Sequence, residues 1–405
     1  MGRIYKTVGI RAEEKSVGVY VHIPFCINKC PYCDFASTAA TRLPEDRYVD
    51  CLVRELSSRV EKESFSAGKT PLESIYIGGG TPTLFSPDSI KRIIENIKER
   101  FSPVKGCEVT IEANPDTVDL ERLKGFIDAG ANRISIGLQA LNDKDLKALG
   151  RTHCAGKAEE SFHLSRQAGF KNIGVDLIFG VPGQQAQDLE ASVRKVIAFK
   201  PEHISVYGLT IEEGTRFHAL YGSGRAGAGA GASSLPAEQD EIRMYEAVVR
   251  LLKEAGHIHY EISNFALSGR LSVHNRGYWL GRDYLGLGAS AHSYLSYPLW
   301  GRRWWNSGDV NGYMARIEKT GDAVDGSEEL TRQEAVTEAL MTGLRMLDVG
   351  IDAGPFKDRF GKYPREEFRN WAELEREGFI KSDGEGLFLT QKGVLLANEV
   401  FLRIV

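Results

Sequence analysis

His22-Ile23-Pro24-Phe25-Cys26-Ile27-Asn28-Lys29-Cys30-Pro31-Tyr32-Cys33-Asp34-Phe35 holds three cysteines within eight residues, at C-x3-C-x2-C spacing. The stretch begins at the end of the apolar run Val17–Ile23, so its cysteines are expected in a loop that follows a strand. A loop of this length can turn three thiolates inward around one small centre. A cubane iron–sulfur cluster held entirely by protein takes four cysteines. Three would leave one iron free, as a catalytic metal site keeps one position open for its substrate.

The free iron could bind a ligand that carries both an amine and a carboxylate, such as S-adenosylmethionine (SAM). Electron transfer into the sulfonium of SAM yields an adenosyl radical, and this chemistry belongs to the cofactor. The alternatives are a zinc knuckle, with His22 or Asp34 as the fourth ligand, and three unrelated buried thiols. Zinc sites usually pair C-x2-C with a second, distant pair, and the sequence has no such pair. The spacing therefore favours a cluster.

The composition is that of a soluble protein from a reducing compartment. The chain has 405 residues, room for two or three domains, and its net charge of −4 predicts no general attraction to nucleic acid or anionic lipid. Its six cysteines form no secreted disulfide framework, and we expect Cys51, Cys107 and Cys154 to be ordinary buried thiols. No apolar run approaches the roughly 18 residues that cross a membrane, and Met1–Lys15 does not resemble a signal peptide. We expect a cytoplasmic protein.

Strands alternate with helical sequence through the first half of the chain. Alternation at this spacing predicts a parallel sheet with right-handed crossovers. Six units are two short of a closed (β/α)8 barrel, so we predict an α/β fold, an open partial (β/α)6 barrel. The six expected strands are Val17–Ile23, Ser74–Ile77, Glu108–Ile111, Arg133–Gly137, Ile173–Phe179 and His203–Leu209.

The second half of the chain is less regular. Tyr221–Ser234 is a Gly/Ala-rich segment that cannot bury a core, so we predict a flexible insert. His257–Trp305 is rich in aromatic residues and glycine, has no clear period, and is expected to fold over the mouth of the barrel. From about Leu330 the pattern changes to helices, followed by short apolar runs around Asp383-Gly384 that predict a hairpin, and by a last helix at Val394–Leu402.

These patterns predict three parts. The barrel occupies 1–215, the flexible insert and an extension that covers the barrel occupy 216–329, and a small winged-helix-like helical domain occupies 330–405. A winged helix can bind DNA, but 330–405 carries 11 Lys and Arg against 13 Asp and Glu. Without a basic face, a packing or partner-docking role is favoured, and we expect no nucleic-acid partner.

Several polar residues fall where barrel chemistry is found, at the carboxyl ends of strands. The run Gly78-Gly79-Gly80-Thr81 could let the backbone approach a ligand closely, or could be a plain tight turn. Glu112 could bind an ammonium group or ribose hydroxyls, or could cap a helix. Asp176 interrupts a strongly apolar strand, where an unpaired carboxylate is costly.

In combination these motifs resemble the radical-SAM superfamily. Tyr20-Val-His22-Ile-Pro-Phe-Cys26 narrows the resemblance to the oxygen-independent coproporphyrinogen III oxidase group and its HemW relatives, over roughly Val17–Tyr294. The resemblance implies a partial radical-SAM barrel, with a [4Fe–4S] cluster on Cys26, Cys30 and Cys33. His22 could equally be a hydrogen-bonded core histidine, and Arg151 a surface cation. The residues that the resemblance places around the cluster and SAM are Tyr20, His22, Tyr32, Gly78, Gly79, Gly80, Thr81, Glu112, Gln139, Arg151 and Asp176.

Two departures from the oxidase pattern point to the HemW branch, whose members are haem chaperones. The oxidase motif has a further cysteine where this chain has Phe35, and Ser272–Trp279 is similar to the HNxxYW motif of HemW. The similarity implies that His274 could ligate haem iron while Tyr278 and Trp279 stack on the porphyrin. The alternative is that His274 and its neighbour Asn275 hydrogen-bond to loop backbone and Trp279 fills core.

The resemblance therefore implies a haem chaperone that binds haem and transfers it to an acceptor protein, with a cluster and SAM. An electron donor is implied if SAM is cleaved. Two enzymes remain as alternatives: the coproporphyrinogen oxidase itself, and another radical-SAM enzyme such as a methyltransferase. Phe35 and the HNxxYW residues favour the chaperone.

Overall fold

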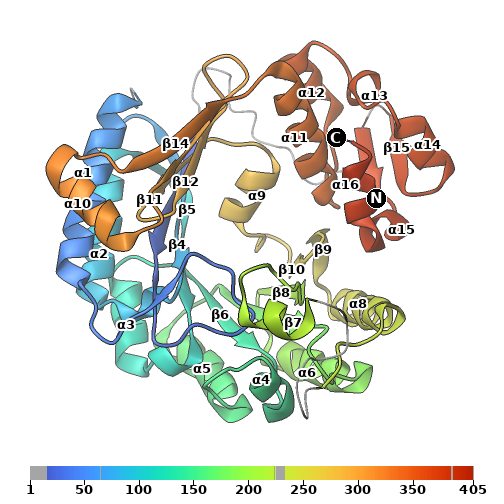
Figure 1. Cartoon of the computed structure of the whole chain (residues 1–405), viewed down its shortest axis with the longest axis horizontal. Helices are drawn as coiled ribbons and strands as arrows, with labels where there is room; N and C mark the ends of the chain where they lie inside the picture. Colours follow the sequence, from blue (N-terminus) through green and yellow to red (C-terminus); the bar gives the residue numbers. More distant parts are fainter. Residues whose placement is uncertain (1–15, 64, 223, 225–232, 385, 405) are drawn as a thin grey trace.

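The computed structural model describes residues 16–63, 65–222, 224, 233–384 and 386–404. Most of the predicted Gly/Ala-rich insert lies outside these residues. The described chain is built on a twelve-stranded sheet of order β14-β13-β12-β11-β1-β4-β5-β6-β7-β8-β10-β9, with a smaller helical part beside it (Figure 1).

Six neighbouring strands at the centre of this sheet are parallel and follow the order of the sequence. They confirm the predicted α/β partial barrel. Their outward side chains are apolar, as Val17, Val19 and Val21 illustrate, and pack against helices in one continuous core. The six are β1 (Val17–Ile23), β4 (Pro71–Gly79), β5 (Ser102–Ala113), β6 (Arg133–Gln139), β7 (Ile173–Phe179) and β8 (His203–Gly208).

Helices cover the outer face of the six parallel strands (Figure 1). The second of them begins at Pro87, because the Ser86 hydroxyl accepts from the Ser89 backbone N–H and Pro87 occupies the first turn. The helices of this half are α1 (Glu45–Lys62), α2 (Pro87–Arg100), α3 (Leu120–Asp128), α4 (Asp143–Ala148), α5 (Ala155–Ala168), α6 (Ala186–Phe199), α7 (Arg216–Tyr221) and α8 (Glu238–Glu254).

The sequence predicts that the aromatic segment 257–305 folds over the barrel mouth, but the segment does more than this. It extends both edges of the six-stranded sheet, whose edge strands would otherwise have unpaired backbone groups. Between the two extensions, the short helix α9 (Val273–Trp279) packs against β4. The added elements are β9 (Ile258–Glu261), β10 (Asn264–Ala266), β11 (Tyr284–Leu287), β12 (His292–Leu295), β13 (Arg302–Asn306), α10 (Val310–Thr320) and β14 (Val324–Glu329).

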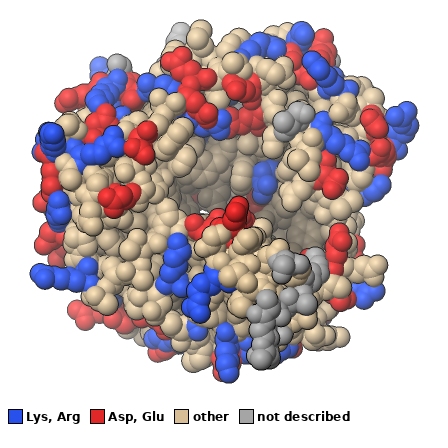
Figure 2. Space-filling view, in the orientation of Figure 1, with Lys and Arg blue, Asp and Glu red and all other residues tan. Residues whose placement is uncertain are grey.

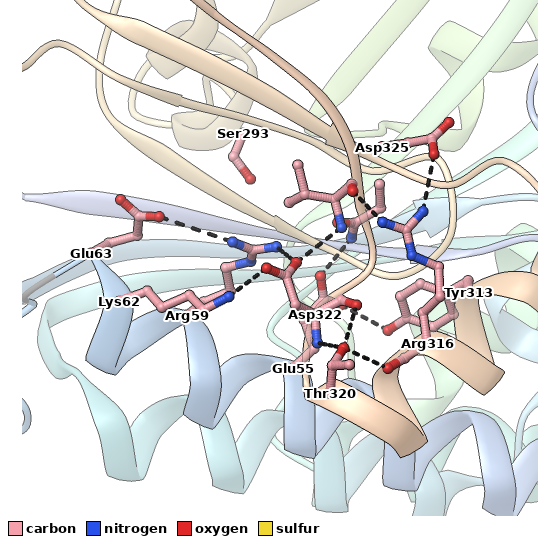
Figure 3. Close-up of polar contacts among 12 residues, drawn as sticks. Glu55, Arg59, Lys62, Glu63, Ser293, Tyr313, Arg316, Thr320, Asp322 and Asp325 are labelled. Atoms are coloured by element: carbon pink, nitrogen blue, oxygen red, sulfur yellow. Dashed lines mark hydrogen bonds and ion pairs between the residues drawn. The ribbon is translucent and has the colours of Figure 1, made fainter.

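A polar network joins this extension to α1 (Figure 3). The buried Glu55 carboxylate accepts hydrogen bonds from the Gly288 backbone N–H at 2.8 Å, Asn306 Nδ2 at 2.5 Å and the Tyr313 hydroxyl at 2.7 Å. Arg59 forms an ion pair with Asp322 at 2.5 Å. The extension is therefore held to the first helix of the barrel by buried polar contacts.

The last part of the chain has its own apolar core, in which Val336, Leu344, Phe368 and Leu387 are buried. The hairpin predicted at Asp383-Gly384 is present, with β15 antiparallel to β16. The elements are α11 (Arg332–Arg345), α12 (Ala353–Phe360), α13 (Pro364–Glu367), α14 (Trp371–Arg376), β15 (Ile380–Asp383), β16 (Gly386–Leu389), α15 (Gln391–Leu395) and α16 (Ala397–Leu402).

Two local expectations are wrong. The last helix is not continuous, because Leu396, with φ −117° and ψ 35°, leaves the helical region and separates α15 from α16. Cys51 and Cys107 are buried, but Cys154 is exposed, because it stands at the N-terminal cap of α5 on the surface. Among the described residues, no helix has the length and apolar composition that crossing a membrane requires.

Candidate cofactor site

A cavity of about 350 Å³ lies at the carboxyl ends of the parallel strands. In the view of Figure 2 the face of the molecule is hollowed at its centre, where Figure 1 places α9. The size is that of a small-molecule site. The cavity brings together most of the site residues predicted from the sequence: Cys26, Tyr32, Cys30, Cys33, Gly79, Gly80, Thr81, Glu112, Gln139, Arg151, Asp176 and Asn275.

The cysteine loop is held at both ends. At its start, His22 is buried at the end of β1, and its Nε2 donates to the carbonyl oxygen of Ala36 at 2.8 Å, beyond the last cysteine. The Tyr20 hydroxyl lies 2.8 Å from His22 Nδ1. Both ring nitrogens are therefore engaged, so His22 fixes the loop and is not the fourth ligand of a zinc ion. Tyr20 and His22 lie behind the loop rather than in the cavity lining.

The surroundings of the three thiols fit a cluster. Among the described residues, no group of three or more His, Cys, Asp or Glu side chains could hold one metal ion. A zinc ion needs its sulfur ligands at about 2.3 Å from a single centre, whereas a cubane gives each thiolate an iron of its own. Donors already face two of the sulfurs, since Thr81 Oγ1 lies 3.6 Å from Cys26 Sγ and Arg151 Nη1 lies 3.4 Å from Cys30 Sγ. The residues present therefore fit the cluster.

The glycine run after β4 closes on the cysteine loop. Gly79 has φ +113°, a conformation that side chains rarely adopt. A Cβ on Gly80 would lie 2.6 Å from the carbonyl oxygen of Phe25 and 3.0 Å from Cys26 Sγ. Only glycine allows the backbone to come this close, and a ligand on the cluster would meet backbone groups here.

Two carboxylates face the cavity from neighbouring parts of the barrel. Glu112 accepts from the Tyr76 hydroxyl at 2.6 Å and from the Gly79 backbone N–H at 3.1 Å, and burial raises its pKa to about 7. Burial also raises the pKa of Asp176, whose two oxygens each lie 3.4 Å from Ser135 Oγ. Hydrogen bonds from Ser205 and Ser135 and the charge of Arg133 oppose this rise, and a bound ligand could donate further hydrogen bonds to the same carboxylate.

Sequence reasoning missed several residues that line the same cavity. A signal was available, since these strands are polar at every second position although parallel strands covered on both faces are usually apolar throughout. Glu108, Thr110 and Glu112 of β5 show the pattern, which indicates a polar barrel interior. The missed strand residues that line the cavity with polar side chains are Tyr76, Arg133, Ser135, Ser205 and Tyr207.

Arg133 is the cation at the base of this interior. Its side chain is 1% exposed, and its Nη1 donates to Thr110 Oγ1 at 3.3 Å. The carboxylate of Glu108 lies 4.0 Å from its Nε. Arg133 therefore offsets part of the negative charge that Glu108, Glu112 and Asp176 bring to the barrel interior.

The HNxxYW residues lie on α9, and only Asn275 of the four lines the cavity. His274 is 3% exposed; its Nδ1 lies 2.8 Å from Ser74 Oγ and its Nε2 lies 2.8 Å from the Tyr278 hydroxyl. Burial lowers the pKa of His274 to about 3, so the imidazole is neutral. Trp279 packs under Arg345, whose guanidinium carbon is 4.4 Å from the ring centre.

The ring of His274 therefore bonds to the side chains of Ser74 and Tyr278 and not to loop backbone, and Trp279 is half-buried. Ligation of haem iron by His274 stays a prediction. It would require His274 to break a hydrogen bond with Ser74 or Tyr278.

Known proteins match both the domains and nearly the full length of this chain. The model of the Radical SAM superfamily matches residues 20–196, and that of the HemN C-terminal domain matches residues 330–396. Heme chaperone HemW of Bacillus subtilis (strain 168) is 36% identical over 94% of this chain and 97% of its own length. Mouse radical S-adenosyl methionine domain-containing protein 1, mitochondrial, is 31% identical over 96% of this chain and 87% of its own length.

Among solved structures, the coproporphyrinogen III oxidase (HemN) from Escherichia coli, a radical SAM enzyme, is similar with a TM-score of 0.80. The match covers 96% of this chain and 90% of that one at 23% identity, and it shows a common fold. The family follows from the full-length relatives. The chain belongs to the HemW family of the radical SAM superfamily.

Proposed function

We propose that the protein is a haem chaperone, which binds haem and transfers it to an acceptor protein, and that it carries a [4Fe–4S] cluster and SAM. The observation that carries the proposal is the similarity to heme chaperone HemW of Bacillus subtilis along almost the whole of both chains. A relationship of that extent includes the barrel, the extension and the last domain, and is not limited to a cofactor-binding core.

The cluster would be held by Cys26, Cys30 and Cys33, with one iron open to SAM. Thr81 and Arg151 would donate to two of the coordinating sulfurs, because they already face those atoms. Hydrogen bonds to the sulfurs are among the factors that set the potential of such clusters.

SAM would lie between the cluster and the carboxylates. When bound and reduced, this pair of cofactors supplies an adenosyl radical. The backbone at Gly79 and Gly80 would face the amino-acid end of SAM, and Glu112 and Asp176 would accept from its ammonium group or ribose hydroxyls. Gln139, Arg151 and Tyr32 would complete the walls of the cavity.

An oxidase is the second candidate, because the fold of coproporphyrinogen III oxidase matches this chain closely. Phe35 argues against an oxidase function. The oxidase motif has a cysteine at this position, whereas the Phe35 side chain is 62% exposed at the cavity and offers no thiol.

The test uses anaerobically reconstituted protein. We expect stoichiometric haem binding in a titration followed by the Soret band, and transfer of that haem to an apo-haemoprotein. With reductant and SAM, the same preparation should form no protoporphyrinogen IX from coproporphyrinogen III. Steady product formation would make the protein an oxidase, and the absence of haem binding would reject the chaperone.

A further inference from the structure

Three aromatic rings meet below the cavity, and Tyr76 is the one that reaches it. The Tyr76 ring stacks on His274 with centroids 5.1 Å apart and planes at 26°, and on Tyr20 at 6.2 Å and 30°. Tyr20 and His274 are themselves 6.4 Å apart. The place of Tyr76 therefore depends on both neighbours.

Tyr76 in turn holds a cavity carboxylate. Its hydroxyl donates to Glu112 at 2.6 Å. The packing around this hydrogen bond is tight, because a Cβ on Gly78 would lie 2.9 Å from the Tyr76 ring and 3.0 Å from Glu112 Oε2. A shift of the Tyr76 ring would consequently move the Glu112 carboxylate or break this hydrogen bond.

Hydrogen bonds, in addition to packing, hold His274 in place. Its two nitrogens are hydrogen-bonded to Ser74 and Tyr278. Its backbone N–H and that of Val273 donate to Glu108 at 3.2 Å and 3.1 Å, which anchors the start of α9 to β5. The imidazole therefore presents one set face to Tyr76.

Asn275, the next residue, reaches the cavity directly. It is one of the lining residues, and its backbone N–H is already bonded to Ser272 Oγ at 3.3 Å. Among the described residues, its side-chain amide has no hydrogen-bond partner. An amide placed in this way can donate to, or accept from, a bound ligand.

We propose that the first two residues of the HNxxYW motif serve the SAM site. His274 is a positioning residue that holds Glu112 through Tyr76, and Asn275 contributes its amide to the ligand. In this role both nitrogens of the imidazole keep their hydrogen bonds to Ser74 and Tyr278, so neither is available to iron. It rests on the proposed binding of SAM in this cavity.

The experiment measures SAM affinity of reconstituted protein by isothermal titration, with iron content and melting temperature recorded for every variant. His274→Ala should weaken SAM binding about tenfold, as expected when a hydrogen bond to a charged group is lost. His274→Phe, which keeps a ring against Tyr76, should recover much of the affinity. Asn275→Ala should also weaken SAM binding.

His203→Ala is the matched control. His203 is likewise a buried interior histidine, and its Nε2 lies 2.8 Å from the hydroxyl of a tyrosine, Tyr260. No ring contact joins it to Tyr76 among the described residues. His203→Ala should lower the melting temperature as His274→Ala does, and leave SAM affinity unchanged.

A double-mutant cycle tests the route of the effect. If His274 acts through Tyr76, the losses from His274→Ala and Tyr76→Phe should overlap in the double variant rather than add. Additive losses, or equal losses from His203→Ala, would overturn the positioning role. Undiminished SAM affinity in Asn275→Ala would remove that residue from the site.

The outcomes also separate this inference from the proposed function. If the unsubstituted protein binds no SAM, the SAM site itself is rejected, and the inference with it. If it binds SAM equally well with His274→Ala, only the inference falls. Loss of the haem spectrum in both His274→Ala and His274→Phe, with SAM affinity unchanged, would return His274 to the role of iron ligand.

Discussion

The pKa of Glu112 is unusually high for a carboxyl group that is expected to bind a cation or hydroxyl groups. Burial, together with the charge of Asp176, raises its pKa from 4.5 to about 7 against the opposing effects of the hydrogen bonds from Tyr76 and Gly79 and the charge of Arg133. In the ligand-free protein, the folded state holds the proton of Glu112 more tightly than the unfolded state does. The free energy of unfolding should therefore fall as the pH rises from about 4.5 towards 7.

The first prediction concerns the pH dependence of SAM binding. Because SAM should bind the ionised carboxylate, its affinity should rise as the pH increases through about 7. Binding near neutral pH should release a proton, which titration in buffers of different ionisation enthalpy measures. Glu112→Gln should bind SAM more weakly and show a flatter profile. An unchanged profile in this variant would show that another group titrates.

The second prediction concerns Gly80. Gly80→Ala should disturb the cysteine loop, because its Cβ would meet the Phe25 carbonyl at 2.6 Å and neither backbone can give way easily. We expect a lower iron content after anaerobic reconstitution. Gly156→Ala is the control, since the nearest atom to its Cβ would be Cys154 Sγ at 3.9 Å. Full iron content in Gly80→Ala would contradict the close approach of the two loops.

At the residue scale the sequence identified the groups whose chemistry is conspicuous. Three cysteines in eight residues, and an aspartate in an apolar strand, stand out from their surroundings. Tyr76 and Ser205 do not, because one tyrosine or serine in a strand is unremarkable until neighbouring strands bring it to the barrel interior. The register between neighbouring strands brings these side chains together, since Tyr20 pairs with Tyr76 and Asp176 pairs with Ser205.

The elements divide in the same way. The parallel strands were predictable because long apolar runs carry their own signal. The strands β13 and β14 were not, since Arg302–Asn306 combines two arginines with two tryptophans without alternation, and Val324–Glu329 is mostly charged and polar. They are strands because they pair with each other, and Arg303 lies opposite Glu328 in that pairing with an ion pair at 2.7 Å. Such pairing depends on tertiary structure and leaves no periodic trace in either segment.

The third prediction concerns the attachment of this extension to α1. Glu55→Ala would leave donors on Gly288, Asn306 and Tyr313 without their acceptor. We expect a loss of about 3 kcal/mol in the free energy of unfolding, at roughly 1 kcal/mol for each donor. Chemical denaturation measures it.

Arg47→Ala is the control for Glu55→Ala. Arg47 also joins α1 to α10, through Glu318, but this ion pair is half exposed. Exposed pairs contribute little to stability, so the free energy of unfolding, measured by the same chemical denaturation, should hardly change. Equal losses in the two variants would mean that burial does not distinguish these contacts.

At the scale of the whole molecule, α9 joins the cavity to the last domain. Asn275 lines the cavity, while Arg276 forms an ion pair with Asp348 at 3.3 Å. Trp279 packs under Arg345 at the end of α11. The helix that carries the family motif is therefore also one of the contacts between the barrel and the C-terminal domain.

The last prediction tests that joint. Trp279→Ala removes a half-buried ring together with its cation–π contact to Arg345, a loss of about 2 kcal/mol. Because the contact spans the two parts, the C-terminal domain should open more often, and the amides of α11 should exchange faster with solvent. Hydrogen exchange followed by mass spectrometry measures this.

Trp371→Ala provides the comparison, because Trp371 makes the same kind of contact, with Arg365 at 4.9 Å, but entirely inside the C-terminal domain. It should destabilise α14 without loosening α9. If the two variants exchange alike in α9 and α11, then Trp279 is not part of a joint. If Trp279→Ala instead shifts the Soret band of bound haem while α11 stays protected, the tryptophan touches the porphyrin, as the motif alone first suggested.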